Sequence, residues 1–508
     1  MKPSHYWPFL VIITLFSVIY AFNSWVSDDW YMGLRTVRNF TEGLGITWNL
    51  GERTQLFTCP LWMMLFTPFY FLTREGFFTT VYLQFFIGLL FYFRLYRCLG
   101  KISFLTLSFF LLCSSSFTDY QSSGTESALS LLLWCFFLTT PSFKKEKFLF
   151  AALLILNRLD FLIILSPWLA LSLYKERNYK EVSLLLLPAA LWSLFSLFYF
   201  GLPLPTTFYA KITNSISFLG KIELGLSYYK ASIKYDPLLG LSLLILPFLL
   251  IKMKKSPLLY GSVIYVIYLL VVGGDFMAGR LITSLYLIIL YHAVQAFSFS
   301  PISKKCSLPI AFAFLVVSFL GVKSPFLPVT HKKEFFYENG VADEKQFYAA
   351  QGNSPLIRLI FKERPYYSLE APGNRNDDRR NFYVSYVVGM FGFYTHPNQY
   401  ILEPSGIASP FMIYFPTIKN ARQGHYLKRV PKELVAYYKN GTPLPEGQLR
   451  NYMEKWHLIL SSPLFSVERL RAIWDINTIN YKQELSNYWD NPESFKKGKG
   501  VGVERLIL

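Results

Sequence analysis

Charged residues are scarce in this sequence, and their scarcity excludes an ordinary soluble protein. Asp, Glu, Lys and Arg make up 16% of the 508 residues, whereas an average soluble protein has about 25%. Hydrophobic residues make up 53%, and 48 phenylalanines and 35 tyrosines help to raise the aromatic share to 19%. A soluble protein of this length would need more polar surface, and a disordered chain would have far fewer apolar residues. The composition therefore predicts a protein that crosses a membrane several times and also has a soluble portion.

Several familiar motifs are also absent from the sequence. The five cysteines show neither the spacing of a zinc site nor an evident disulfide pair, and no His-Glu-x-x-His pattern occurs. The sequence has no P-loop, no glycine-rich nucleotide-binding segment and no internal repeat. An activity that depends on a bound nucleotide is therefore not expected, and nothing favours a transporter built from inverted repeats.

The net charge of +18 arises from 50 Lys and Arg against 32 Asp and Glu. In a soluble domain such an excess would favour nucleic-acid binding. Here the basic residues cluster in short loops between apolar runs, where they mark the cytoplasmic side of the membrane. We therefore expect the lipid bilayer, and no nucleic acid, as a partner.

The apolar runs predict about eleven transmembrane helices, with the N-terminus in the cytoplasm. The first run has no small-x-small cleavage site and is expected to be an uncleaved anchor. The segment Phe148–Tyr174 carries Asn157, Arg158 and Asp160 near its middle, where a charge costs at least about 2.5–3.5 kcal/mol. Because both of its flanks are basic, a hairpin of two short helices with its tip outside satisfies both constraints. The remaining spans are expected near Pro8–Val26, Phe77–Tyr96, Ile102–Phe117, Ala128–Thr140, Ser183–Phe200, Leu238–Ile251, Leu258–Val272, Leu281–Phe297 and Leu308–Val322.

This topology places nearly every unusual polar cluster on the outer face, as expected for an active site that opens outward. We predict a transmembrane domain at residues 1–323, with an outer loop and interfacial helices at 27–76. Residues 324–508 should form a soluble extracytoplasmic α/β domain, which is a typical domain length. Within it, we expect strands near Phe382–Val388 and Tyr400–Leu402 and helices near Glu433–Lys439 and Leu449–Trp456.

Two adjacent carboxylates, Asp28 and Asp29, follow the first span. Apolar residues recur after them at helical spacing, which predicts an amphipathic helix on the outer membrane interface. The pair could simply cap this helix, although capping contributes only about 1 kcal/mol and one carboxylate would suffice. The pair could instead supply a general base or ligate a divalent cation. No other metal pattern supports the cation, so no cofactor is firmly expected.

The outer loop continues with Arg-x-x-Arg-Asn, Trp-Asn-Leu-Gly-Glu-Arg and Thr-x-Pro-Leu-Trp. Six further segments follow in order: SGTESAL at 123–129, NRLDF at 157–161, YFGLPLPTTFYAK at 199–211, VVGGDFMAGR at 271–280, GMFGFY at 389–394 and ARQGHY at 421–426. Together these segments resemble the GT-C type glycosyltransferases related to the terminal β-(1→2)-arabinofuranosyltransferase of mycobacteria and corynebacteria. The chain departs from the family pattern at Leu159, where proline is usual, and at Thr206, where asparagine is usual.

The resemblance implies an inverting enzyme of the bacterial cytoplasmic (inner) membrane. It would transfer a sugar, for example a furanose such as arabinofuranose, from a polyprenyl-phosphate donor to a cell-envelope glycan acceptor on the outer face. A lipid-linked donor agrees with the lack of any cytoplasmic stretch long enough for a nucleotide-sugar domain. Asp28 or Asp29 would be the general base, because one carboxylate must remove the proton of the acceptor hydroxyl.

The same resemblance nominates cations for the departing phosphate, which needs compensation of its charge. These are Lys211, Arg280 and Arg158. Each has a structural alternative, since Arg158 could pair with Asp160, Lys211 could snorkel, and Arg280 could anchor its helix at the interface. Substrate-binding roles are implied for Glu126, Asp275 and His425, which could equally serve a helix start, a tight turn and local structure.

Aromatic residues of the tail, such as Tyr394, Tyr400 and Tyr426, could stack on sugars or simply pack in a core. Two other functions stay open. A transporter or flippase of lipid-linked sugars would explain the spans and basic sites, but not the paired carboxylates. A non-catalytic envelope-assembly protein would rely on its tail and would keep binding its partners without either carboxylate.

Overall fold

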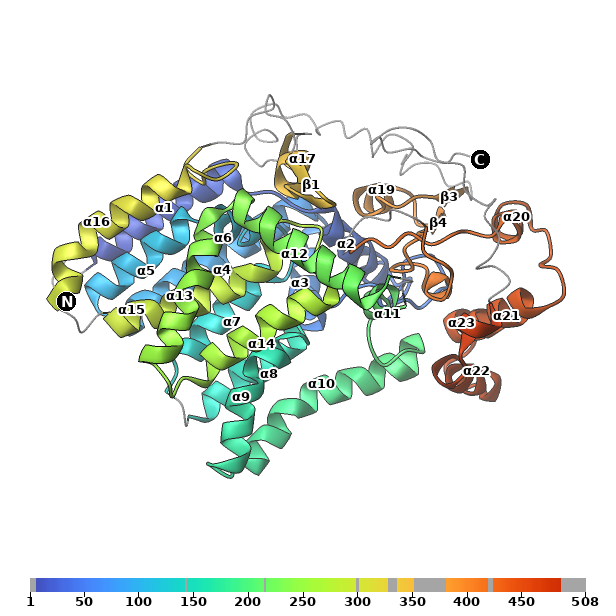
Figure 1. Cartoon of the computed structure of the whole chain (residues 1–508). Helices are drawn as coiled ribbons and strands as arrows, with labels where there is room; N and C mark the ends of the chain where they lie inside the picture. Colours follow the sequence, from blue (N-terminus) through green and yellow to red (C-terminus); the bar gives the residue numbers. More distant parts are fainter. Residues whose placement is uncertain are drawn as a thin grey trace. The chain divides into compact units, whose positions relative to one another are not determined.

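The computed structural model describes residues 6–141, 144–213, 216–297, 301–327, 336–350, 381–418 and 424–485, which are mostly helical (Figure 1). The chain divides into two compact units, each built from three stretches. The first unit comprises Met1–Ser27, Glu75–Ala189 and Ser217–Pro365, and the second comprises Asp28–Arg74, Ala190–Ile216 and Tyr366–Leu508. The predicted boundary at residue 323 therefore falls inside the first unit, and the outer loop groups with most of the tail.

The first unit is a helical bundle. Its helices pack in a chain of neighbours, with α4 against α7, α7 against α8, and α14 against both α9 and α12. Its elements are α1 (Trp7–Asn23), α4 (Phe77–Cys98), α5 (Lys101–Cys113), α6 (Ser115–Tyr120), α7 (Ser127–Thr139), α8 (Lys145–Asn157), α9 (Phe161–Tyr174), α12 (Phe218–Tyr235), α13 (Pro237–Lys252), α14 (Pro257–Val272), η2 (Arg280–Ile282), α15 (Thr283–Phe297), α16 (Pro301–Ser318), β1 (Tyr337–Glu338), β2 (Val341–Ala342) and α17 (Glu344–Ala350).

Glycines allow helix backbones of this bundle to approach one another closely. A Cβ atom on Gly261 of α14 would lie 1.9 Å from the carbonyl oxygen of Ile164 in α9. A Cβ atom on Gly225 of α12 would lie 2.5 Å from the carbonyl oxygen of Leu270 in α14. Small residues at helix crossings are typical of membrane-embedded bundles, where close van der Waals packing replaces the hydrophobic effect.

Helix starts in the first unit are fixed by local side chains. The Glu75 carboxylate accepts hydrogen bonds from the N–H groups of Phe77, Phe78 and Thr79, which would otherwise lack partners in the first turn of α4. Asp236 caps α13 in the same way, and its Oδ1 atom accepts the N–H of Leu238 at 3.2 Å.

Three helices of the described residues are each long and apolar enough to cross a membrane. They are Phe77–Cys98, Tyr179–Phe200 and Arg280–Phe297. Two bent helix pairs raise the number to five if each pair counts as one span. The chain is thus a helical protein with three to five candidate spans in this part of its structure, and the larger number of about eleven stays a prediction.

The predicted hairpin at Phe148–Tyr174 illustrates why fewer helices qualify as spans than the sequence predicted. Helix α8 ends at Asn157 and α9 begins at Phe161, so the break falls where the charged residues predicted it. The two helices have 13 and 14 residues, which corresponds to about 20 Å each at 1.5 Å per residue. Neither alone matches a hydrocarbon core of about 30 Å.

The second unit combines the outer loop, the end of α10 and the tail. Its two short strands, predicted from the apolar runs of the tail, pair in parallel with Tyr383 opposite Ile401. The helices predicted near residues 433 and 449 are also present. The elements are α2 (Asp28–Thr41), α3 (Pro60–Thr73), α10 (Tyr179–Phe200, whose first half belongs to the first unit), α11 (Thr206–Ile212), β3 (Phe382–Val384), α19 (Gly389–Tyr394), β4 (Tyr400–Leu402), η3 (Pro410–Met412), α20 (Lys432–Asn440), α21 (Gln448–Ser461), α22 (Val467–Thr478) and α23 (Tyr481–Glu484).

Two buried arginines of α2 hold the tail of the second unit. Arg35 donates to the carbonyl oxygens of Trp48, Gly392 and Gln399 at 2.9–3.0 Å. Arg38 donates to the carbonyl oxygen of Thr395 at 3.0 Å. Both side chains are fully buried, whereas a helix lying on a membrane interface would turn its arginines toward water. The amphipathic pattern of α2 is therefore explained by burial of its polar side against peptide carbonyls.

Candidate functional site

The four predicted site residues of the first unit lie in one ionic cluster. The Glu126 Oε1 atom is 3.8 Å from Nη1 of Arg158 and 3.6 Å from Nη2 of Arg280. Arg280 is in turn 3.7 Å from Asp275, measured from Nη1 to Oδ2. Together with Asp160, these residues form what we call the Glu126 cluster. Three segments that are more than 30 residues apart in sequence thus bring their charges together.

Arg158 pairs with Asp160, which is the structural role predicted for it from the sequence as an alternative to phosphate binding. Its Nε atom donates to Oδ1 at 3.1 Å and its Nη2 atom donates to Oδ2 at 2.6 Å, which is a bidentate pair. The Tyr265 hydroxyl donates to the same Oδ2 atom at 2.6 Å. The ion pairs of Arg280 are longer, at 3.6 and 3.7 Å, and exceed a direct hydrogen bond.

The charges of the Glu126 cluster do not balance. Its three carboxylates face two guanidinium groups, so the fully ionised cluster carries one excess negative charge. A phosphate group entering this cluster would have to replace a carboxylate as the partner of an arginine.

Residues of the segments 123–129, 157–161 and 271–280 fix the backbone around the Glu126 cluster. Glu126 directly precedes α7, and the side-chain amide of Asn157 donates to the carbonyl oxygen of Glu126 at 3.2 Å and to Ser130 Oγ at 2.9 Å. Helix α14 ends at Gly273, whose φ of 89° suits only glycine well. Gly279 has a φ of 76°, and a Cβ atom there would lie 2.2 Å from the Ser116 hydroxyl oxygen. The glycines of the 271–280 segment thus position Asp275 and Arg280.

In the second unit, Asp28 and Asp29 have different surroundings. The Asp28 carboxylate accepts the N–H of Gly389 at 2.9 Å and the N–H of Met390 at 2.7 Å, one on each oxygen. It is 7% exposed, and burial raises its pKa to about 6, although the two backbone N–H groups oppose this rise. Asp29 is more exposed than Asp28. Asp28 therefore fastens the start of α19, and Asp29 is the more accessible of the two carboxylates.

Gly389 has a packing reason to be glycine. A Cβ atom at this position would lie 1.8 Å from the backbone carbonyl oxygen of Asp28. Helix α19, which carries the GMFGFY segment, can therefore contact the start of α2 only without a side chain here. Two segments nominated by the family resemblance, separated by about 360 residues, are thus in direct contact.

Lys211 and His425 lie on two further segments of the second unit. Lys211 is half-buried in the last turn of α11. The start of this helix is fixed by Thr206, whose hydroxyl donates to the carbonyl oxygen of Gln55 at 2.8 Å. His425 is half-buried next to Tyr426, and residues 421–423 of its segment lie outside the described residues. The structure thus assembles Glu126, Arg158, Asp275 and Arg280, but leaves the other four predicted residues on three separate segments.

The tyrosines of the tail are mainly packed in the core. Tyr400 is 7% exposed, lies 4.5 Å from Tyr438 between ring centroids, and donates its hydroxyl to Glu52 Oε1 at 2.9 Å. Tyr426 is also buried. Tyr394 is half-buried, with its hydroxyl oxygen 3.5 Å from that of Tyr31. Of the three tyrosines, only Tyr394 has a ring that is accessible to a sugar.

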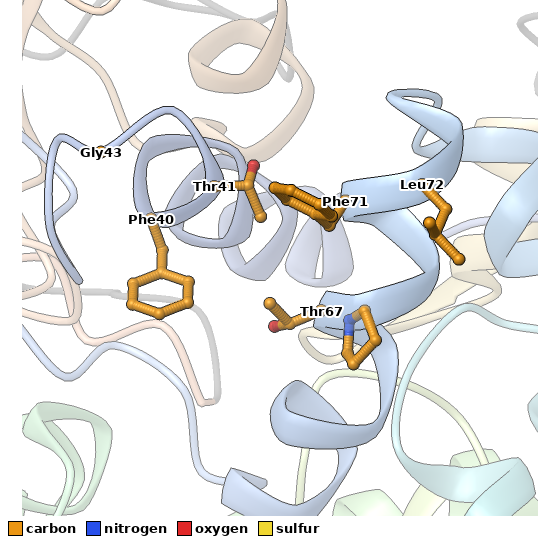
Figure 2. Close-up of a pocket in the computed structure, with 7 residues that line it drawn as sticks. Phe40, Thr41, Gly43, Thr67, Phe71 and Leu72 are labelled. Carbon is orange, nitrogen blue, oxygen red and sulfur yellow. The ribbon is translucent and has the colours of Figure 1, made fainter.

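An open apolar cavity of about 470 Å³ lies between the end of α2 and α3 in the second unit (Figure 2). None of the predicted site residues lines it. Its lining has no charged side chain and suits an apolar ligand better than a sugar. The lining residues are Phe40, Thr41, Gly43, Thr67, Pro68, Phe71 and Leu72.

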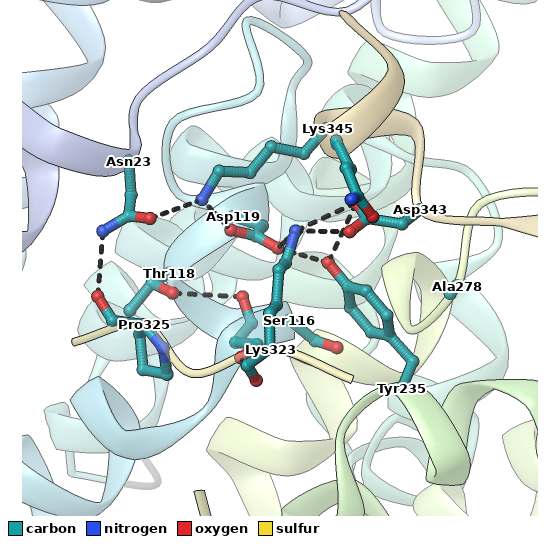
Figure 3. Close-up of polar contacts among 12 residues, drawn as sticks. Asn23, Ser116, Thr118, Asp119, Tyr235, Ala278, Lys323, Pro325, Asp343 and Lys345 are labelled. Atoms are coloured by element: carbon teal, nitrogen blue, oxygen red, sulfur yellow. Dashed lines mark hydrogen bonds and ion pairs between the residues drawn. The ribbon is translucent and has the colours of Figure 1, made fainter. Parts of the chain in front are cut away.

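Sequence reasoning missed a second buried ionic group in the first unit, the Asp119 network (Figure 3). Asp119 receives Lys345 Nζ at 2.6 Å on Oδ1, and Lys323 Nζ at 3.0 Å and the Tyr235 hydroxyl at 2.5 Å on Oδ2. Lys323 also pairs with Asp343 at 2.9 Å. The network fixes residues 336–350 to the helical bundle. The polar run around Asp119 was visible in the sequence, but its distant lysine partners were not.

The described part of the chain contains no group of three or more His, Cys, Asp or Glu side chains arranged to hold a metal ion. Comparison with known proteins adds no relative, because no protein-family model, no curated protein and no solved structure matches the chain.

Proposed function

We propose that this chain is a GT-C type glycosyltransferase of the bacterial cytoplasmic membrane. It would transfer a sugar from a polyprenyl-phosphate donor to a cell-envelope glycan on the outer face. The observation that carries the proposal is the Glu126 cluster, in which charged residues from three family-like segments meet inside a helical unit. Buried charges in an apolar bundle also pair for structural reasons, so the cluster supports the proposal by placing the residues of these segments together.

In this proposal Asp29 is the general base. Its carboxylate removes the proton of the acceptor hydroxyl while that oxygen bonds to the anomeric carbon of the donor. The bond between this carbon and the phosphate oxygen breaks, and the phosphate leaves with the bonding electrons from the opposite face. The product therefore has inverted anomeric configuration. Asp28 acts as a positioning residue, because both of its oxygens are engaged by α19.

Arg280 is the preferred partner of the departing phosphate. Its ion pairs to Glu126 and Asp275 are 3.6 and 3.7 Å long, whereas Arg158 is held by Asp160 at 2.6 Å. A furanose such as arabinofuranose is the first sugar to test.

The test uses the full-length protein in detergent with a panel of radiolabelled polyprenyl-phosphate sugars and envelope-glycan acceptors. We expect transfer by the wild type, with inversion, and a loss of about 10²–10⁴-fold in Asp29→Asn with donor binding kept. Asp28→Asn should instead lower thermal stability together with activity. Chelation by EDTA should leave transfer unchanged, and a loss on chelation would favour a cation at the carboxylate pair.

Other outcomes would redirect the proposal. Wild-type transfer that survives both substitutions removes this mechanism. A wild-type protein that binds the donor and moves it across a vesicle membrane without transferring the sugar is a transporter. If no donor is bound, the envelope-assembly function moves ahead.

A further inference from the structure

Helix α22 presents an apolar face to the surroundings. Val467 is 55% exposed, Leu470 44% and Trp474 70%, and Phe465 just before the helix is 81% exposed. The three helical residues are spaced by three and four positions and so lie on one face. Arg471, which is also exposed, shares that face. Large apolar side chains grouped at such exposure mark an interaction surface.

Two polar side chains anchor α22 to the end of α10 within the second unit: Arg469, on the face opposite the apolar one, and Asn477, which lies seven residues after Leu470 and so on its side of the helix. Arg469 is fully buried and donates to the carbonyl oxygens of Phe198 and Tyr199 at 2.7 and 2.9 Å. Asn477 donates to the carbonyl oxygen of Gly201 at 2.8 Å. These bonds satisfy carbonyl groups that the end of a helix leaves without partners. Helix α22 is therefore fixed against the last residues of α10.

Helix α10 is one of the three helices long and apolar enough to cross a membrane among the described residues. Its 22 residues give a length of about 33 Å, close to the thickness of a hydrocarbon core of about 30 Å. If α10 spans, Phe198 and Tyr199 must lie at one membrane surface. The exposed Leu191 and Leu194 in its second half continue the apolar surface toward that end.

The apolar surface of α22 continues onto the end of α10. The ring of Phe465 lies 5.3 Å from the ring of Phe198, so the apolar surface passes from α10 to α22 without a polar interruption at this contact. Tryptophan is enriched where a protein meets the boundary between headgroups and acyl chains, because its ring is apolar and its N–H is polar. An arginine on the same face can extend its guanidinium to lipid phosphates while its stem stays in apolar contact.

We propose that α22 is a monotopic membrane anchor, whose exposed face lies in the headgroup and upper acyl region of the bilayer at the end of α10. Trp474, Leu470, Val467 and Phe465 would be immersed, and Arg471 would meet lipid phosphates. The occupant of this surface is therefore lipid. The tail domain would be attached to the membrane at a second point, rather than extending freely into solution. This inference does not depend on the proposed enzymatic function.

The test measures the surroundings of Trp474 in full-length protein reconstituted in lipid nanodiscs. The difference in tryptophan fluorescence between wild type and Trp474→Phe isolates this one indole among the 11 tryptophans. We expect brominated phosphatidylcholine to quench the difference signal at least twofold more strongly than it quenches the control below. Aqueous acrylamide should quench it weakly. Phenylalanine keeps the surface apolar. Because position 474 is exposed, this variant should fold like the wild type.

The matched control places a tryptophan elsewhere on the tail. Glu433 is exposed on α20, so Glu433→Trp in the Trp474→Phe background should be quenched by acrylamide and not by brominated lipid. Quenching of Trp474 by acrylamide alone would overturn the proposal, because the helix would then face water. Quenching by neither reagent would also overturn it, since a second copy of the chain or another protein segment would then cover the face.

Discussion

The first unit contains two buried ionic groups that differ in charge balance and in distance. The Asp119 network joins two aspartates to two lysines at 2.6–3.0 Å. The Glu126 cluster has three carboxylates for two arginines, and three of its ion pairs measure 3.6–3.8 Å. A balanced network with short bonds leaves little for a ligand to bind. The excess negative charge of the Glu126 cluster disfavours an anionic ligand unless a carboxylate gives up its arginine. We predict a structural role for the Asp119 network and keep the functional role of the Glu126 cluster as a proposal.

The largest effect on stability is expected in the Asp119 network. Asp119→Asn should lower the free energy of unfolding by about 3–5 kcal/mol, because it leaves the buried charges of Lys323 and Lys345 without their shared carboxylate. Thermal melting in detergent measures this effect. The matched control is Lys234→Ala, which removes an exposed ion pair with Glu338 and should cost less than about 1 kcal/mol. Equal losses in the two variants would contradict a structural role for Asp119.

The second effect concerns the Glu126 cluster and rests on the proposed function. Arg280→Gln should weaken donor binding by about 10–100-fold, which corresponds to about 1.4–2.7 kcal/mol, and should also lower the melting temperature, because Glu126 and Asp275 lose a buried partner. Donor titration and melting of the same preparation separate the two quantities. Arg158→Gln is the comparison variant, and it should mainly destabilise the fold because Asp160 loses its bidentate partner. Unchanged donor binding in Arg280→Gln would contradict the assignment of this arginine to the donor phosphate.

The smallest expected effect is a pH dependence of the free energy of unfolding, caused by the Asp119 network. Burial lowers the pKa of Lys345 to about 8 from an ordinary 10.5, although Asp119 opposes this change. Between these values the unfolded chain binds more protons than the folded chain, so the free energy of unfolding should rise with pH. Lys345→Met should remove a rise of about 1 kcal/mol between pH 8 and 9.5. Melting of both proteins across this range checks the sign, with Lys234→Met as the control.

An unchanged pH slope in Lys345→Met would mean that Lys345 keeps its proton throughout this range. The ion pair with Asp119 would then outweigh burial, and the network would be held by charge more strongly than its desolvation suggests. In that case the contrast with the Glu126 cluster would become sharper.

Features with a local cause could be predicted from the sequence. The break between α8 and α9 could be predicted from Arg158 and Asp160, because charged residues interrupt the apolar run at this point. The strands at 382–384 and 400–402 followed from short apolar runs between turn residues. The convergence of Glu126, Arg158, Asp275 and Arg280 was not predicted by spacing. The family resemblance only placed these residues in one function.

Features with a distant cause could not be predicted. Periodicity assigns Arg35 and Arg38 to a solvated face, but their partners are peptide carbonyls about 360 residues away, and a carbonyl leaves no mark in a sequence. Lys323 and Lys345 likewise meet Asp119 across more than 200 residues. The spacing of Asp28 and Asp29 did not show which carboxylate serves the fold. The distinction arises from Gly389 and Met390, whose N–H groups select Asp28.

The contact between α2 and the tail has a consequence for biosynthesis. Arg35 leaves the ribosome about 360 residues before the carbonyl groups of Gly392 and Gln399 that it will bind. At an elongation rate of about 5–20 residues per second, this separation corresponds to roughly 20–70 seconds. For that period Arg35 can bind the nearby carbonyl oxygen of Trp48, but its bonds to Gly392 and Gln399 cannot form. Assembly of the second unit is therefore a late event, which must wait for synthesis of the tail.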